Sequence, residues 1–147
     1  MVAAVTVGAW VAFSVCGGLG AVARYVADTS VLAGRLREPL ARLTVINVVG
    51  SLLLGVVYAV FYVDYYVGFQ AVPVGGQLGY RVDEWSWLLV RSSCVGFLGG
   101  FTTFSTVMVT AVTDAPLRKS LGWLVLMGTL CVLAWLAGCV GASAVLR

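Results

Sequence analysis

Four long stretches of the chain contain no charged residue, and they restrict its fold more than any other feature. They run over Val2–Ala23, Leu43–Val63, Ser92–Thr113 and Ser120–Leu146. Each exceeds the roughly 20 residues that a helix needs to cross about 30 Å of hydrocarbon. Only 10% of the residues are charged, against about 25% in soluble domains. We therefore predict one domain, residues 1–147, an all-α membrane protein with four transmembrane helices.

Side chains that serve enzymes and metal centres are scarce in this sequence. Histidine is absent, and the four cysteines, all in the apolar runs, form no C-x-x-C pair. Zinc sites and disulfide frameworks use such clusters, so we interpret the cysteines as buried free thiols. The sequence offers no set of nucleophile and base of the kind that covalent catalysis uses. We therefore predict that the chain is not an enzyme.

The basic residues are divided unequally between the two sides of the predicted membrane domain. With four spans, both termini lie on one side, and the two connections opposite them carry six basic residues against three on the terminal side. Lys and Arg accumulate in cytoplasmic loops. We therefore predict a multi-pass protein of the cell membrane with extracytoplasmic termini. The first connection, Thr29–Pro39, would be cytoplasmic, and the longest, residues 62–86, has no role that the sequence reveals beyond linking two spans.

Span two carries a narrow stripe of polar and small residues. Thr44, Asn47, Ser51 and Gly55 follow at steps of three, four and four residues, which places them on one helix face. Small and hydrogen-bonding residues are typical of helix packing in membranes, which explains Ser51 and Gly55 as well as a functional role does. Asn47 is different, because an amide near the middle of the membrane is costly without a partner. Its two N–H donors would suit an anion.

Span three contains the segment GFLGGFTTFST, Gly96–Thr106, in which adjacent glycines precede adjacent threonines. Each glycine weakens a helix by about 1 kcal/mol relative to alanine, and threonine hydroxyls offer competing hydrogen bonds. We therefore predict that the third helix is broken in mid-membrane. Carbonyls freed at that depth must face protein or a cavity, and they commonly bind a cation. The ring edges of Phe97, Phe101 and Phe104 could hold an anion, although core packing is the simpler interpretation of each.

Three motifs, in family order, resemble the small fluoride channels of the Fluc or CrcB family. They are GGLGAVARY (Gly17–Tyr25), TVINVVGS (Thr44–Ser51) and GFLGGFTTFST, and they fall in three of the four spans. The resemblance implies a dimer of antiparallel subunits, in which the partner is a second copy or a homologous chain. It also implies two narrow fluoride pores, a structural sodium ion at the dyad, and passive export that lowers cytoplasmic fluoride.

The resemblance assigns roles to individual residues. The backbone carbonyls of Gly99 and Thr102 would hold the sodium ion, together with an equal pair from the second subunit. Asn47 would line the pore, and Phe104 would be the first of two pore-facing phenylalanines. Donors that replace the water around fluoride would be Asn47 and the hydroxyls of Ser105 and Thr106.

Two further polar residues have roles that the sequence leaves open. Ser51 lies in the second motif, and Arg24 closes the first span. Arg24 could place its charge at the membrane interface, attract anions to a vestibule, or anchor the first connection. We therefore expect both residues to have either a vestibule role or a structural one.

Two positions depart from the family pattern. The motif usually continues TTFSTF, so the second pore phenylalanine would stand where this chain has Val107. A carboxylate that commonly follows is replaced by Thr110. Some members of this family work as two different subunits of fixed orientation, and the unequal charge distribution fits a fixed orientation. We therefore hypothesise that the chain is one subunit of a heterodimer.

Two other functions are compatible with parts of the sequence. A small multidrug-type transporter also has four spans and antiparallel pairing, but it needs a carboxylate inside the membrane. The six acidic residues all lie outside the uncharged runs, although Asp64 abuts the end of span two. A non-conducting partner subunit of a heterodimeric fluoride channel is favoured by Val107 and opposed by Asn47 and Phe104.

Overall fold

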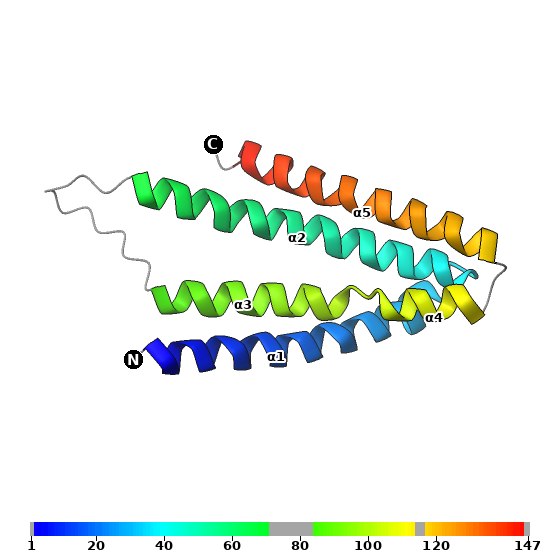
Figure 1. Cartoon of the computed structure of the whole chain (residues 1–147), viewed down its shortest axis with the longest axis horizontal. Helices are drawn as coiled ribbons and strands as arrows, with labels where there is room; N and C mark the ends of the chain where they lie inside the picture. Colours follow the sequence, from blue (N-terminus) through cyan, green and yellow to red (C-terminus); the bar gives the residue numbers. More distant parts are fainter. Residues whose placement is uncertain (1, 71–83, 114–116, 146–147) are drawn as a thin grey trace, which may run out of the picture.

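The computed structural model describes residues 2–70, 84–113 and 117–145, and this part of the chain is almost entirely helical (Figure 1). The elements are α1 (Val2–Val26), a π-helical turn η1 (Ala27–Leu32), α2 (Pro39–Gln70), α3 (Glu84–Phe101), α4 (Ser105–Thr113) and α5 (Leu117–Val145). Four segments of the described chain are long and apolar enough to cross a membrane: Val7–Leu32, Pro39–Phe61, Leu88–Thr113 and Arg118–Val145. The prediction of an all-α protein with four transmembrane helices is confirmed.

The third span is interrupted, as the sequence predicts. Helix α3 ends at Phe101 and α4 begins at Ser105, so the three residues between them belong to neither helix. The ribbon straightens at this point between the two labelled helices (Figure 1). The Gly99-Gly100 pair lies in the last turn of α3, where it weakens the helix before the threonines follow.

Two helices extend beyond the limits that the sequence analysis gave them. Helix α1 continues through η1 to Leu32, into the predicted connection Thr29–Pro39, and α2 runs to Gln70 rather than ending near Val63. Charge marks where a span leaves hydrocarbon, but it does not stop backbone hydrogen bonding, so a helix can continue past a charged residue such as Asp64. Of the predicted connection 62–86, residues 71–83 lie outside the described residues, and its role stays undetermined.

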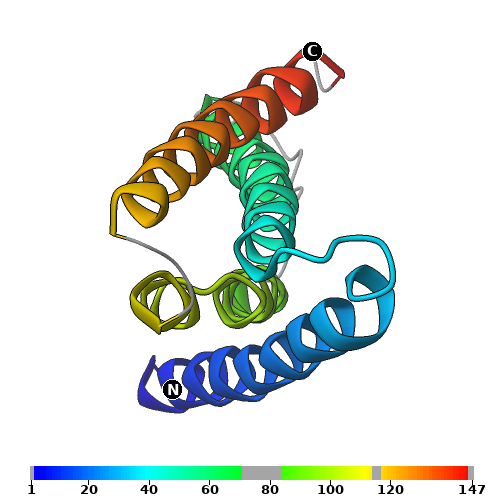
Figure 2. The same cartoon turned by 90° about the vertical axis from the view of Figure 1, so that its right-hand side faces the viewer.

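Glycines set the packing of α1 against α3. A Cβ built on Gly20 would overlap the carbonyl oxygen of Phe97, and one built on Gly100 would overlap that of Gly17. Close approach through small residues is how membrane helices gain van der Waals contact when lipid offers no hydrophobic driving force. Figure 2 shows the resulting arrangement, in which α1 lies along α3 while α2 crosses α5.

The α2–α5 pair uses the same device at one crossing point. A Cβ on Gly55 would overlap the carbonyl oxygen of Trp135, and a Cβ on Gly138 would overlap that of Leu52. The rings of Tyr58 and Trp135 pack beside this crossing with centroids 5.5 Å apart. The two helices therefore meet backbone to backbone and fix the position of α2, which carries the polar stripe.

The buried apolar cluster of the described residues gathers around α4. It joins Leu40 and Leu43 of α2, Val107 and Ala111 of α4, and Met127 of α5. Both α4 residues are almost fully buried, at 2% and 3% exposed. One face of α4 is therefore held against α2 and α5, which fixes the orientation of the residues at its start.

We predict that Gly138→Ala lowers the free energy of unfolding by about 1–3 kcal/mol, because its methyl group would push α5 away from the Leu52 carbonyl. Gly128→Ala in the same helix is the matched control, since nothing lies within 4 Å of the position of its Cβ. Thermal unfolding of both variants in detergent measures the difference. Equal effects of the two substitutions would contradict the packing role of Gly138.

Candidate functional site: the break between α3 and α4

The amide of Asn47 pairs with the backbone of Thr103 at the break. The Thr103 N–H donates to Asn47 Oδ1 at 2.8 Å, and Asn47 Nδ2 donates to the Thr103 carbonyl at 2.9 Å. The side chain is buried, with 6% of its residue surface exposed. The amide therefore satisfies both backbone groups of a residue that lies between two helices, where lipid could satisfy neither.

This pairing changes which carbonyls of α3 are occupied. In a continuous helix the N–H of Thr103 would bond to the carbonyl of Gly99, and that of Thr106 to the carbonyl of Thr102. Instead, the Thr103 N–H goes to Asn47, and the Thr106 N–H reaches Thr103 Oγ1 at 3.4 Å. Among the described residues, neither carbonyl accepts a backbone N–H. These two carbonyls are the ones that the resemblance assigns to a sodium ion.

The freed carbonyls have little competition from side chains. The hydroxyl of Thr102 donates to the Leu98 carbonyl at 3.0 Å and approaches the Gly99 carbonyl only at 3.5 Å. Gly99 itself is exposed, and Thr102 is half-buried. Within the described part of the chain, no group of three or more His, Cys, Asp or Glu residues could hold a metal. A cation here would therefore bind carbonyl oxygens, the ligands that hard cations prefer, and the residues present fit sodium.

Gly50 of α2 also shapes the break, and the sequence analysis did not single it out. A Cβ at this position would overlap Cγ2 of Thr102. Gly50 stands one residue before Ser51 and three after Asn47, so it shares the polar face of α2. That spacing was the available signal, but only the fold shows that Thr102 fills the space. Helix α2 thus contacts two successive residues of the break.

A chain of polar groups continues from the break to α1. Thr103 Oγ1 donates to Thr106 Oγ1 at 3.1 Å, and Nη1 of Arg24 donates to the same oxygen at 3.4 Å. The Nε atom of Arg24 is buried and has no hydrogen-bond partner among the residues that the structure describes. Arg24 therefore leaves one buried donor unpaired next to two hydroxyl groups.

Another arginine holds the first connection. Nε of Arg42 forms an ion pair with Asp28 at 2.8 Å, and its Nη1 donates to the Leu36 carbonyl at 3.3 Å. The guanidinium of Arg24, in contrast, contacts Thr106 of α4. Of the two basic side chains, Arg42 is thus the one whose bonds tie the connection to α2, while the role of Arg24 in attracting anions stays a prediction.

Phe104 and Ser105 are directed away from the packed core. Phe104 is 68% exposed, and Ser105 is also exposed. Phe97 and Phe101, by comparison, stack on each other with centroids 6.2 Å apart and planes at 11°. Of these three rings, Phe104 has the open surface that a pore-facing residue needs.

The two positions that depart from the family pattern differ from each other in burial. Val107 is 2% exposed and lies in the cluster with α2 and α5. Thr110 is half-buried, as is Ser51 on α2. A side chain at position 107 of this subunit therefore faces the protein core rather than the surface that carries Phe104.

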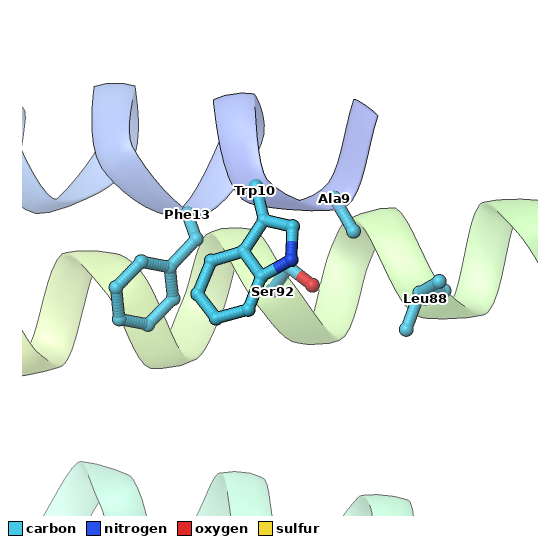
Figure 3. Close-up of a pocket in the computed structure, with 5 residues that line it drawn as sticks. All are labelled: Ala9, Trp10, Phe13, Leu88 and Ser92. Atoms are coloured by element: carbon cyan, nitrogen blue, oxygen red, sulfur yellow. The ribbon is translucent and has the colours of Figure 1, made fainter. Parts of the chain in front are cut away.

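A shallow groove between α1 and α3 lies apart from the break (Figure 3). It has a volume of about 390 Å³ and is lined by Ala9, Trp10, Phe13, Leu88 and Ser92. Trp10 and Phe13 make an edge-to-face contact with centroids 6.1 Å apart. Ser92 supplies the only hydroxyl of this lining, so the groove is almost entirely apolar.

Comparison with known proteins gives the family. The family described as "CrcB-like protein, Camphor Resistance (CrcB)" matches residues 11–144. This chain belongs to the CrcB-like family. A protein of Corynebacterium jeikeium named fluoride-specific ion channel FluC 1 is 34% identical over 121 residues, which are 82% of this chain and 80% of the relative.

Two further similar proteins have related names. Fluoride-specific ion channel FluC of Saccharophagus degradans is 38% identical over 100 residues, 68% of this chain and 61% of the relative. FluC 1 of Leifsonia xyli is 40% identical over 111 residues, 74% of this chain and 65% of the relative. No solved structure matches this chain. The family resemblance predicted from the three motifs is confirmed.

We predict that Gly50→Ala lowers the free energy of unfolding by about 1–3 kcal/mol, because its methyl group would displace Thr102. Thr102→Ser removes the methyl group that collides, so the double variant should recover most of the loss. Thermal unfolding of the two single variants and the double variant forms a double-mutant cycle. Strictly additive effects would contradict the contact.

Proposed function

We propose that this chain is a subunit of a fluoride-selective channel that lowers cytoplasmic fluoride by passive export. The observation that carries the proposal is the break between α3 and α4, which combines freed carbonyls, threonine hydroxyls and the exposed ring of Phe104 in a membrane span. The relatives named as fluoride-specific ion channels support it. They also agree with the prediction that the chain is not an enzyme, because a channel forms and breaks no covalent bond.

The exposure of the break supports a second subunit. Gly99, Phe104 and Ser105 are exposed in the single chain, and unpaired backbone groups are not tolerated against lipid. An antiparallel dimer would cover this surface with its equivalent on a second copy or a homologous chain. The Gly99 and Thr102 carbonyls of both subunits would then hold one structural sodium ion, which would supply positive charge beside the anion path.

The anion path would use groups that are open or donate hydrogen bonds. Phe104 would present its ring edge, where an aromatic ring carries partial positive charge. The hydroxyls of Ser105 and Thr106 would replace water around fluoride, and the uncompensated guanidinium of Arg24 would attract the anion to them. The place of Asn47 on this path stays a prediction, because its amide is bonded to Thr103 here.

The direction of transport rests on charge. Six basic residues lie in or near the connections opposite the termini, against three on the terminal side, which favours extracytoplasmic termini. A cell interior that is electrically negative drives anions outward, so an open fluoride path would export without a coupled ion. This orientation, like the sodium ion, is part of the proposal.

A non-conducting partner subunit is the second candidate, and Val107 favours it. The side chain at that position is 2% exposed and packs in the core. Of positions 104 and 107, where the family pattern has a pair of phenylalanines, only Phe104 therefore offers an exposed ring. Such a chain could complete a dimer with a homologous subunit that supplies the missing groups.

Fluoride efflux from proteoliposomes loaded with potassium fluoride tests both candidates. A potassium ionophore starts the efflux, and a fluoride electrode follows it, for the chain alone and for the chain mixed with a family relative from the same genome. Efflux from the chain alone would make it a self-sufficient homodimer, and efflux only from the mixture would make it half of a heterodimer. No efflux from either sample of folded protein would contradict the channel proposal.

We predict that Phe104→Leu slows fluoride efflux by about tenfold, because an aromatic contact worth about 1.4 kcal/mol changes a rate by that factor. Phe97→Leu is the matched control, since the Phe97 ring is stacked on Phe101 and should be needed only for packing. The same efflux assay measures both variants. Equal slowing by the two substitutions would exclude a specific role for the Phe104 ring.

A further inference from the structure

We propose that Asn47 is the positioning residue of the cation site, which it keeps open by holding the Thr103 N–H away from the Gly99 carbonyl. This inference rests on the proposed function, because it concerns the sodium ion of that proposal. It gives Asn47 a role in addition to the pore-lining one that the resemblance implies. Asn47 itself would not touch the cation, because it acts through the backbone of Thr103.

Two acceptors, Asn47 Oδ1 and the Gly99 carbonyl, can compete for the same backbone N–H. The N–H of Thr103 stands four residues after Gly99, so the Gly99 carbonyl is its partner in an unbroken helix. A backbone N–H at membrane depth must have an acceptor. Asn47 Oδ1 supplies that acceptor at 2.8 Å. If this oxygen is removed, the nearest way to satisfy the N–H is to extend α3 by a residue, and that would occupy the carbonyl.

The Asn47 amide can fix the position of Thr103 by itself. Oδ1 and Nδ2 meet the N–H and the carbonyl of the same residue, Thr103, so two hydrogen bonds fix both the distance and the direction. Asn47 is 6% exposed and stands on α2, which is fixed against α5 at the glycine crossing. The position of Thr103 is therefore transmitted from a rigid helix rather than set by the break alone.

The two N–H groups of the Asn47 amide have different partners. Nδ2 carries two N–H groups; it donates to the Thr103 carbonyl at 2.9 Å and lies 3.3 Å from Sδ of Met127. Of these two contacts only the one to the Thr103 carbonyl is a bond of the break, because Met127 belongs to α5. Holding Thr103 therefore occupies Oδ1 and one N–H of the amide, and the second N–H faces a thioether, which is a weak acceptor.

Sodium-dependent thermal stabilisation of the purified dimer, with potassium as the comparison ion, tests the proposal independently of ion flux. Asn47→Ala removes the acceptor for the Thr103 N–H and should raise the sodium concentration for half-maximal stabilisation by about tenfold or more. Ser51→Ala, one turn along the same face of α2, is the control and should leave the response unchanged.

Folded Asn47→Ala protein with a wild-type sodium response would overturn the proposal. If that variant does not fold, Asn47→Gln takes its place, because the longer side chain cannot keep both bonds to Thr103, and the same two outcomes apply. A wild-type protein that sodium does not stabilise would overturn both the cation site and this inference. Fluoride efflux measured on the same preparation separates the cases, since efflux without any sodium response would leave the channel proposal standing.

Discussion

The bond between the Asn47 amide and the Thr103 backbone is the interaction on which the rest of this structure depends. A span can be broken inside a membrane only if the freed backbone groups find partners in the protein. Asn47 supplies both partners for one residue of the break, and Gly50 makes room for the residue before it. The break therefore depends on residues of α2 as well as on the third span, although its sequence signature lies in the third span alone.

Close glycine contacts place the helices around the Asn47–Thr103 interaction. Because Gly17 and Gly100 bring α1 and α3 together, the end of α1 comes to lie beside α4, and Arg24 reaches Thr106. Because Gly55 and Gly138 bring α2 and α5 together, α2 is held firmly enough to position Thr103. Packing that looks purely structural thus places a cationic side chain, two hydroxyls and an amide around one short segment.

Residues at one end of the break and along α4 differ sharply in burial. Val107 and Ala111 face a buried cluster, whereas Phe104 and Ser105 at the start of the helix are exposed. The departure from the family pattern at position 107 falls on the buried face of α4, where an aliphatic side chain packs well. The surface that carries Phe104 has no apolar cover within the described chain, which is why a second subunit is part of the proposed function.

Much of the fold could be read from the sequence, because the membrane leaves few choices. Uncharged runs longer than about 20 residues can only cross as helices or fold into a closed barrel, and paired glycines beside threonines weaken a helix whatever surrounds it. The spans, the break and the family follow from these local features. The helix ends at Leu32 and Gln70 could not be predicted in this way. Charge and hydrophobicity indicate where a span leaves the membrane, but they do not indicate where backbone hydrogen bonding stops.

The sequence by itself determined that four helices cross the membrane, that the third is interrupted near Gly99, and that Asn47 needs a polar partner. The tertiary structure decided which partner that is: the backbone of Thr103, fifty-six residues along the chain. It also decided that Gly50 contacts Thr102, that Val107 is buried and that Phe104 is exposed. The physical reason is that a period of 3.6 residues fixes which residues share a helix face, while the rotation of each helix against its neighbours is set by contacts between distant segments.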